Sequence, residues 1–298
     1  MDYSAIMALG AALSWTMAAA FGHRPATELG SLHFNRVRML AAIVVLAGLL
    51  LLLGRPFSVQ SDHMIPLLLS SLIGVVLGDF FLFSAMRRLG PRRTNVLFAT
   101  NAPIAALLGW MILGEYLSTQ TMVAVFVGFG GVVLAIIFGK RRDLAHVWET
   151  VTPPLWLGVV FGLMAATGQA AGVLLVRPVM ADGADPLMVG LVRVIIAAIV
   201  FWVTFPFDRT QRGKPIFPSG KLAGYVALNG LFGLGVGAAM LLQALEFGSV
   251  AKVTILSATT PVLILPIVWF RTKLMPAWGA WFGAGLVVLC SALLVVEL

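Results

Sequence analysis

The chain has 298 residues, of which 60% are apolar and only 11% are charged, and its mean hydropathy is +1.01. These values exclude an ordinary water-soluble domain, because a chain of this size cannot bury so much apolar surface in its own interior. The net charge of +8 does not indicate nucleic-acid binding, since the basic residues lie in the connections between apolar runs. We therefore expect an integral membrane protein.

Ten apolar runs follow one another along the chain, and each approaches the roughly 20 residues that a helix needs to cross a bilayer. The first run lacks the basic start and the cleavage site of a secretory signal, so we expect it to remain as a span. The sequence thus predicts an all-α membrane fold of ten transmembrane helices. The runs lie at 3–21, 37–54, 64–86, 94–113, 119–139, 154–176, 186–206, 221–245, 250–270 and 275–296.

Lysine and arginine are shared unevenly between the two sets of connections. The even-numbered connections hold only Arg55, Arg177 and Lys252. Short cytoplasmic connections carry the basic excess, so we expect the odd connections in the cytoplasm. Both termini then lie on the periplasmic side of a bacterial inner membrane. The odd connections hold sixteen of the 20 basic residues: Arg24, Arg36, Arg38, Arg87, Arg88, Arg92, Arg93, Lys140, Arg141, Arg142, Arg209, Arg212, Lys214, Lys221, Arg271 and Lys273.

The first five runs reappear in degraded form as the last five. Because each half contains an odd number of spans, the second half must enter the membrane upside down. The sequence therefore predicts two inverted five-helix repeats, 1–140 and 154–298, joined by a cytoplasmic linker, 141–153. The matching anchors are Gly74 to Gly78 and then Ala85 with Gly233 to Gly237 and then Ala244, Pro103 with Pro261, and Val37-Arg38-Met39 with Val192-Arg193-Val194.

The same anchors resemble those of the EamA-like family of the drug/metabolite transporter superfamily. The resemblance covers essentially the whole chain and includes Leu113-Gly114-Glu115-Tyr116-Leu117 before a glycine-rich fifth run, and the glycines of 279–285. It implies a ten-span carrier, often an exporter of amino acids, metabolites or toxic compounds, while related branches move nucleotide sugars and sugar phosphates. The Gly114-Glu115 pair has no counterpart near Thr272-Lys273, so any role of Glu115 belongs to the first half alone.

Asp79 is a charge inside the third apolar run. A carboxylate at membrane depth costs roughly 2.5–3.5 kcal/mol on insertion scales, so it should face a cavity or a partner. Three interpretations stay open: Asp79 exchanges a proton or another coupling ion, it binds a cationic group of a cargo, or it pairs with an arginine. Its counterpart in the repeat is Ala238, so symmetry does not require a charge there.

Three further charged residues have different expected roles. Arg193 lies about two turns inside the seventh run, where its planar fork suits an anionic or zwitterionic cargo. The alternative is that its side chain reaches back to the outer interface. Arg38, at the mouth of the second run, is expected to be an interfacial anchor. Glu115, at the outer end of the fourth run, is expected to form a turn and a helix cap.

Pro103 and Pro261 lie near the middle of their runs, where proline removes a backbone donor and breaks the helix. Broken backbone is tolerated in lipid only against protein or a water-filled cavity. The prolines therefore favour a cavity beside these spans, with a simple packing kink as the alternative. The polar residues expected to line the cavity, or else to bridge helices by hydrogen bonds, are Trp15, Thr100, Asn101, Gln169, Asn229, Gln243, Thr259 and Thr260.

No catalytic or metal-binding pattern is found in the sequence. The four histidines lack metal-ligand spacing, and the single cysteine, Cys290, excludes an intrachain disulfide. We expect no enzyme, no metal and no cofactor. The expected function is a secondary active transporter, an exporter of small metabolites such as amino-acid-like solutes by alternating access. Its partners would be the lipid bilayer, a small-molecule substrate and a proton or other coupling ion, with no nucleic acid.

Two other classes of function stay open. A passive facilitator or channel would need a continuous polar path through the bundle. A membrane-embedded lipid-modifying enzyme would need paired acids at one membrane face, which the sequence does not offer. Monomer and homodimer are equally compatible with the sequence.

Overall fold

The computed structural model describes residues 2–116, 118–137, 154–208, 211, 215–260, 262–263, 278–279, 281–283, 285–286 and 289. All the regular secondary structure within these ranges is helical. The first half contains α1 (Tyr3–Leu29), α2 (Ser31–Leu52), η1 (Ser61–His63), α3 (Met64–Ser70), η2 (Ser71–Leu77), α4 (Gly78–Ala99), α5 (Asn101–Leu113) and α6 (Thr119–Ile137). The second half contains α7 (Leu155–Ala181), α8 (Pro186–Val203), η4 (Phe205–Phe207), α9 (Gly220–Gly230), η6 (Leu231–Gly237), α10 (Ala238–Phe247) and α11 (Val250–Ser257).

Six helical segments are long and apolar enough to cross a membrane, and two more are apolar but shorter. The six correspond to the first, second, third, sixth, seventh and eighth predicted runs, and the two shorter helices to the fourth and fifth. An all-helical membrane protein is thus confirmed over the described residues, while the count of ten spans stays a prediction. The tenth run lies largely outside the described residues and the ninth is described only as far as residue 263, while the linker 141–153 and Pro261 lie outside them.

Several helices extend beyond the predicted runs, among them α2 and α4. The helix α2 begins at Ser31 rather than residue 37, so Arg36 and Arg38 lie inside it instead of in a connection. The helix α4 also continues through the arginine-rich stretch 87–93. A run read from hydropathy ends at the first charged residue. A helix, in contrast, continues past a charged side chain that has partners inside the protein.

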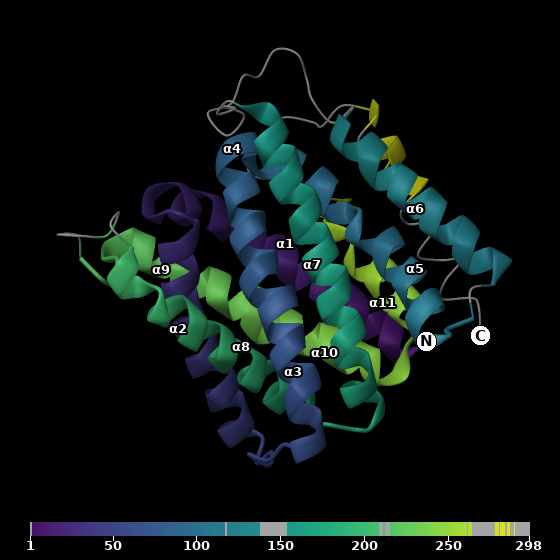
Figure 1. Cartoon of the computed structure of the whole chain (residues 1–298). Helices are drawn as coiled ribbons and strands as arrows, with labels where there is room; N and C mark the ends of the chain where they lie inside the picture. The colour runs from purple at the N-terminus through teal and green to yellow at the C-terminus, as the bar shows by residue number, and fades with distance from the viewer. Residues whose placement is uncertain are drawn as a thin grey trace.

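The two halves pack on each other in a reciprocal pattern (Figure 1). The first helix of the second half, α7, lies along α4 and η2 of the first half. The first helix of the first half, α1, lies in the same way along η6 and α10 of the second. In addition, α2 packs on α8 and α5 packs on α11. This reciprocal pairing is expected of two repeats related by a pseudo-twofold axis.

A seven-residue π-helical segment occurs at the matching place in each half, η2 in the first and η6 in the second. Such wide turns are rare and occur frequently at functional sites. Carbonyl groups of η6 accept hydrogen bonds from α1, with Ser14 Oγ donating to Phe232 at 2.7 Å and Trp15 Nε1 donating to Gly233 at 2.9 Å. The glycine anchors recognised in the sequence lie within or beside these two segments.

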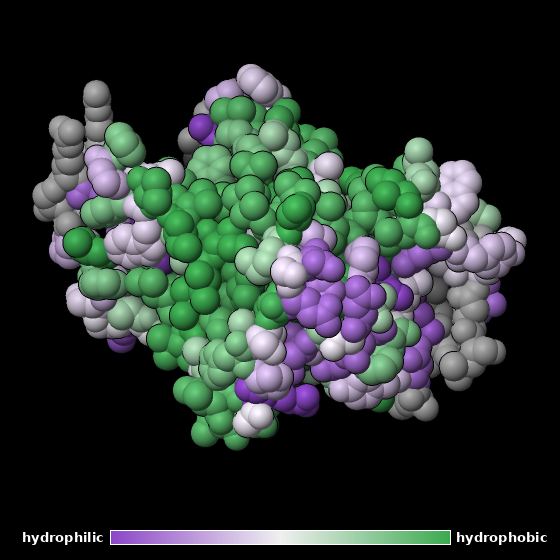
Figure 2. All heavy atoms as spheres, turned by 60° about the horizontal axis from the view of Figure 1, so that its bottom comes forward, coloured by the Kyte–Doolittle hydropathy of each residue, from purple (hydrophilic) through white to green (hydrophobic). Residues whose placement is uncertain are grey.

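The surface is strongly divided by hydropathy. Figure 2 shows broad hydrophobic areas bordering a compact hydrophilic patch, the pattern expected of a bundle whose sides face lipid. Trp110, Ile112 and Phe126 are among the large apolar side chains that are exposed in the structure.

Ion pairs join the two halves mainly at one end of the bundle, which we call the N-terminal end because Asp2 lies there. The connection after α2, the turn after α5 and the connection between α7 and α8 also lie at this end, because of the directions in which these helices run. Among the described residues, one further ion pair between the halves lies at the opposite end, Arg36 with Asp208 at 2.6 Å. The four pairs at the N-terminal end are Asp2–Lys252 at 2.7 Å, Arg55–Asp185 at 3.6 Å, Glu115–Arg177 at 3.8 Å and His63–Asp182 at 3.2 Å, the last being an ion pair when His63 is protonated.

Candidate functional site

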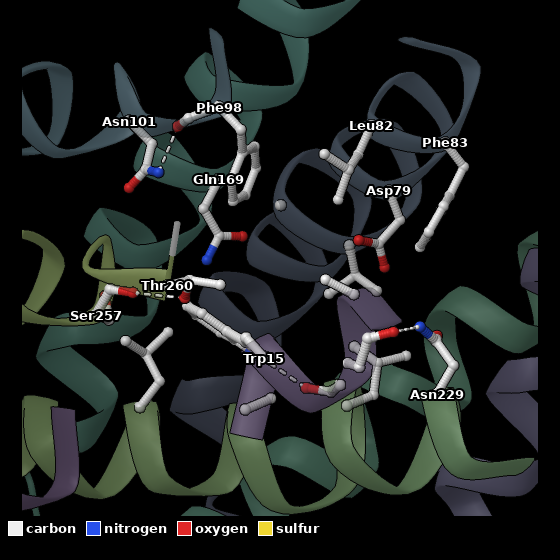
Figure 3. A pocket seen from close by; sticks show the side chains of 18 of the residues that line it. Trp15, Asp79, Leu82, Phe83, Phe98, Asn101, Gln169, Asn229, Ser257 and Thr260 are labelled. Atoms are coloured by element: carbon white, nitrogen blue, oxygen red, sulfur yellow. Dashed lines mark hydrogen bonds between the residues drawn. The ribbon is translucent and has the colours of Figure 1, made fainter. Parts of the chain in front are cut away.

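A cavity of about 150 Å³ lies between the two halves and is lined by both (Figure 3). One enclosed water occupies about 10–15 Å³ on this measure, so the space suits about ten waters or one small organic molecule. The first half contributes Trp15, Ala18, Ala19, Arg38, Gly74, Val75, Asp79, Leu82, Phe83, Met86, Asn95, Phe98, Ala99 and Asn101. The second half contributes Gln169, Gly190, Arg193, Val194, Asn229, Gly233, Leu234, Ala238, Leu241, Ser257, Ala258 and Thr260.

Asp79 and Arg38 form an ion pair at the wall of this cavity, with Arg38 Nη2 donating to Asp79 Oδ2. The Arg38 side chain is almost fully buried, and that of Asp79 is 17% exposed. Asp79 lies in the first turn of α4, directly after η2. Of the three interpretations of Asp79 left open by the sequence, the structure shows the pairing with an arginine.

Two asparagines accept hydrogen bonds from the other two nitrogens of Arg38. Arg38 Nε donates to Asn35 Oδ1, and Nη1 donates to Asn229 Oδ1, both at 2.9 Å. Each asparagine is tied to backbone by its own amide, Asn35 to Ser31 and Asn229 to Ala18. The guanidinium is therefore fixed by neighbours from α2, α4 and α9.

The expectation that Arg38 is an interfacial anchor is wrong. Its residue exposure is only 3%, and its guanidinium lies over the ring of Phe83 at 4.6 Å from the centroid. The physical reason is that α2 begins earlier than the hydropathy predicts and carries Arg38 into the bundle. The repeat signal in the sequence, which matched Arg38 with Arg193, was the better indicator of its environment.

Arg193 is also buried, with 8% of its surface exposed, and lines the cavity from α8. It does not reach back to the interface. Its Nε atom is buried without a hydrogen-bond partner, and no ion pair within 4.0 Å involves it in the part of the chain that the structure describes. The charge of Asp79 still acts on it from a greater distance.

Five of the uncharged residues expected at the cavity line it: Trp15, Asn101, Gln169, Asn229 and Thr260. In Figure 3 the amide of Gln169 points into the open space, while Trp15 lies across its floor. Thr260 Oγ1 donates to the carbonyl groups of Ala12 and Ser257, both at 3.2 Å. These residues offer neutral hydrogen-bonding groups rather than charge.

Three other expected residues do not line the cavity. Thr100 and Thr259 donate to carbonyl groups three residues earlier in their own helices, and Gln243 donates to Glu246. Each is satisfied within its own helix or turn, which the sequence alone cannot reveal. Their expected contact with a cargo finds no geometric support here.

The helix break expected beside Pro103 lies at Thr100, between α4 and α5. Pro103 itself occupies the first turn of α5, where the missing backbone donor costs little because that donor has no partner inside the helix. Phe98, Ala99 and Asn101 around the break all line the cavity.

Glu115 follows Gly114, which ends α5 in a left-handed conformation with φ 65°. Both carboxylate oxygens of Glu115 accept from the backbone N–H of Val250, at 3.0 and 2.9 Å. Glu115 therefore caps the first turn of α11, in the other half of the chain. The sequence predicted a turn and a cap but not which helix is capped.

Sequence reasoning missed Asn35, Asn95 and Ser257. Asn35 lies one helical turn before Arg38, so its spacing could have identified it if the helix had been extended to Ser31. The cavity lining includes Asn95, at the start of the fourth predicted run, and Ser257, well inside the ninth. Within the described residues, no group of three or more His, Cys, Asp or Glu is placed to hold a metal ion.

A helical membrane bundle with two alike halves around one charged cavity has the architecture of a membrane transporter. The profile of the EamA-like transporter family matches residues 2–137 and again 156–296. The chain belongs to this family, and it is thus a membrane transporter of the drug/metabolite transporter superfamily.

The fold is shared with solved structures. One crystal structure aligns with 98% of this chain and 96% of its own length, with a TM-score of 0.78 and 16% sequence identity. At this identity the likeness shows the fold alone. No curated protein matches the chain.

Proposed function

We propose that the protein is a secondary active transporter that exports small organic solutes, amino-acid-like or otherwise, by alternating access. The observation that carries this proposal is the cavity lined by both halves, because rocking of one half against the other would change its exposure. The two halves, 1–140 and 154–298, are the moving units, and the connection 141–153 links them.

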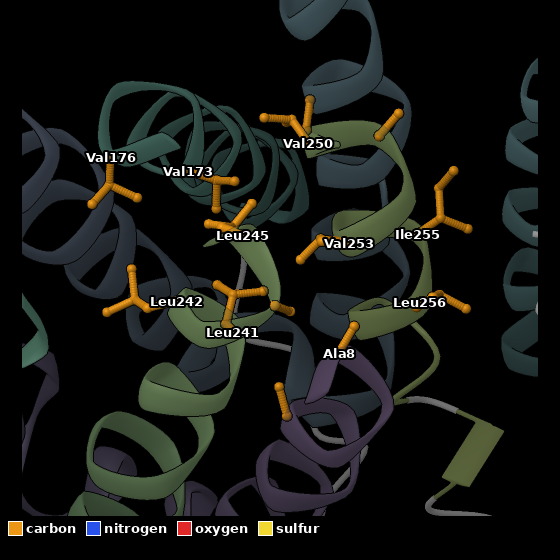
Figure 4. Close-up of a cluster of buried hydrophobic side chains, with 14 of the residues drawn as sticks. Ala8, Val173, Val176, Leu241, Leu242, Leu245, Val250, Val253, Ile255 and Leu256 are labelled. Atoms are coloured by element: carbon orange, nitrogen blue, oxygen red, sulfur yellow. The ribbon is translucent and has the colours of Figure 1, made fainter. Parts of the chain in front are cut away.

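The N-terminal end of the bundle supports a carrier rather than an open channel. Apolar side chains of α1, α7, α10 and α11 gather there, among them Ala8, Val176, Leu245 and Val250 (Figure 4). In each of these helices the cluster lies between the cavity and the N-terminal end. Together with the four ion pairs between the halves, this apolar layer interrupts any polar path through the bundle.

Asp79 is the residue to which we assign coupling. A proton on Asp79 would remove the charge that holds Arg38 and would free both side chains for a different arrangement. Protonation of Asp79 would thus couple a proton gradient to a change at the contact between α2 and α4. The protein would lie in a bacterial inner membrane with both termini outside, as the distribution of basic residues favours.

Transport into vesicles of the purified protein tests this function. A panel of radiolabelled metabolites is offered with and without an imposed pH gradient. Saturable uptake that is accelerated by unlabelled solute on the opposite side identifies a carrier. Non-saturating flux or single-channel conductance would contradict the proposal and favour a facilitator, and chemical change of a lipid substrate would favour an enzyme.

A further inference from the structure

Three charged side chains are among the described residues that line the cavity: Arg38, Asp79 and Arg193. Arg38 and Asp79 neutralise each other, and the two asparagines described above accept from the other two nitrogens of Arg38. The cavity therefore keeps one net positive charge, which belongs to Arg193.

Arg193 is held in place without an ion pair within 4.0 Å among the described residues, although the charge of Asp79 acts on it from a greater distance. The Ser71 hydroxyl donates to the Arg193 backbone carbonyl at 2.6 Å, which fixes the backbone. Gly74 leaves room for the guanidinium, since a Cβ there would lie only 3.2 Å from Arg193 Nη2. A guanidinium stays charged at every physiological pH, and a buried charge is costly until an opposite charge pairs with it. The site is thus built for one anionic group.

The rest of the cavity offers little to a second charge. Apolar side chains form much of its wall, including Val75, Leu82, Phe83, Phe98 and Leu241. Asp79 is the acidic residue among the described lining residues, and its carboxylate already binds Arg38. A cargo ammonium group would have to compete with that pair, whereas an apolar group fits the wall without competition.

We propose that the cargo is a small organic monoanion, whose carboxylate or other singly charged acidic group pairs with Arg193 while its apolar body lies against Phe83, Phe98 and Leu82. This inference rests on the proposed transport function and narrows its substrate class. Neutral polar groups on the cargo would find hydrogen-bonding partners in Gln169 and Asn101.

Three probes of the same carbon skeleton test the charge requirement: 4-methylpentanoate, its neutral amide 4-methylpentanamide, and the zwitterion leucine. Binding to the purified wild-type protein is followed by tryptophan fluorescence, since Trp15 lies in the cavity, and exchange is followed by counterflow in vesicles. We expect the carboxylate to bind at least about tenfold more tightly than the other two. Equal or tighter binding of leucine or of the amide, or no binding of the carboxylate, would overturn the inference.

Variants then locate the anion site. Arg193→Gln is expected to weaken carboxylate binding by about ten- to a hundredfold and to leave the amide unaffected, with Arg193→Lys in between. Arg24→Gln, a change of the same kind at an exposed arginine outside the cavity whose ion pair with Glu28 lies within α1, should leave all three affinities unchanged. Unchanged carboxylate affinity in Arg193→Gln refutes the assignment. If that variant does not fold, the wild-type probe series still decides.

The outcomes also separate this inference from the transport function. Counterflow of leucine without counterflow of 4-methylpentanoate would leave the carrier standing and overturn the monoanion. Binding of the carboxylate through Arg193, with no counterflow by any probe, would support the anion site and contradict the transport function.

Discussion

Asp79 and Arg38 form a buried ion pair in the wall of a cavity, and their surroundings explain how a membrane protein tolerates it. Each charge is satisfied by the other, and Arg38 has further acceptors in Asn35 and Asn229. Removing one partner of a buried pair costs about 3–5 kcal/mol, because the other charge is then left uncompensated. Loss of stability and loss of transport must therefore be separated in any test of Asp79.

We predict that Asp79→Asn abolishes gradient-driven transport, because it removes the group assigned to proton coupling. The matched control is Asp208→Asn, which weakens the Arg36–Asp208 ion pair, whose arginine is equally buried but lies away from the cavity. Both variants should unfold at lower temperature in detergent, but only Asp79→Asn should lose uptake driven by a pH gradient. Normal gradient-driven transport by Asp79→Asn would contradict the coupling role.

At this scale the sequence predicted the two charges that interrupt apolar runs, Asp79 and Arg193, since a charge at membrane depth is conspicuous. It misjudged Arg38, whose helix begins before the hydropathy rises. Asn35 lay outside every predicted run for the same reason. Thr100 and Thr259 were predicted to line the cavity but do not, because a hydrogen bond from their hydroxyl groups to the preceding turn cannot be recognised in the sequence.

Among the helices, glycine sets the closest approach between the halves. A Cβ on Gly172 of α7 would lie 2.6 Å from the Cα of Gly74 in η2, too close for the two backbones to remain where they are. We predict that Gly172→Ala destabilises the protein by about 1–3 kcal/mol, as overpacking does. Thermal unfolding in detergent measures the change.

Gly48→Ala provides the control for that substitution. Gly48 lies inside α2, and a Cβ there would meet no atom within 4 Å. This substitution should be neutral or should stabilise the protein by about 0.5–1 kcal/mol through helix propensity. Equal effects of the two alanines would show that the contact between α7 and η2 is not as close as described.

The cap on α11 is a second contact between elements of different halves. We predict that Glu115→Ala lowers the stability by about 0.5–2 kcal/mol, because the backbone N–H of Val250 loses its acceptor. Glu115→Gln keeps an acceptor and should lose less. Unchanged unfolding temperature for Glu115→Ala would show that the cap is not formed.

The start of α1 is tied to α11 through Asp2 and Lys252, and this contact depends on pH. The hydrogen bond from Lys252 lowers the pKa of Asp2 below its usual 3.8, with burial opposing the shift. The folded protein thus holds a proton on Asp2 less readily than the unfolded chain. The stabilisation is present above about pH 4 and is lost as the pH falls through the lowered pKa.

We therefore predict that Asp2→Asn lowers the unfolding temperature at pH 7 and that its difference from the wild type shrinks as the pH is taken below 3.8. Lys252→Met should show the same pH dependence if the pair is responsible. A difference that stays constant between pH 7 and pH 3 would argue against it.

The helices themselves were largely predictable, because long apolar runs have few alternatives to spanning a membrane. The two π-helical segments were not, although the glycines that mark them were visible as repeat anchors. Sequence spacing shows that Gly74 and Gly233 are equivalent. It does not show that the backbone widens there, since that depends on the helix packed against each segment.

For the whole molecule, the decisive feature is the asymmetry between the two ends. Four ion pairs between the halves and an apolar layer lie at the N-terminal end, whereas the cavity lining extends the other way to Met86 and Asn95. A bundle that rocks would break the first set of contacts when it opens there. The sequence predicted the two halves. It could not predict which end of the bundle is closed, because that depends on contacts between residues far apart in the chain.

The most direct test of alternating access is the reactivity of one cysteine in the cavity. Ala19 lines the cavity from α1, and Ala19→Cys would be introduced together with Cys290→Ser. Thr27→Cys and Ser61→Cys serve as controls, since their exposed positions lie at opposite ends of the bundle and should each react from one side only.

A membrane-impermeant thiol reagent is applied to either side of vesicles of known orientation. We predict that the cysteine at position 19 reacts from both sides, and that a transported solute slows both reactions. Reaction from one side alone, under conditions in which the vesicles transport, would contradict a cavity that opens alternately to the two faces of the membrane.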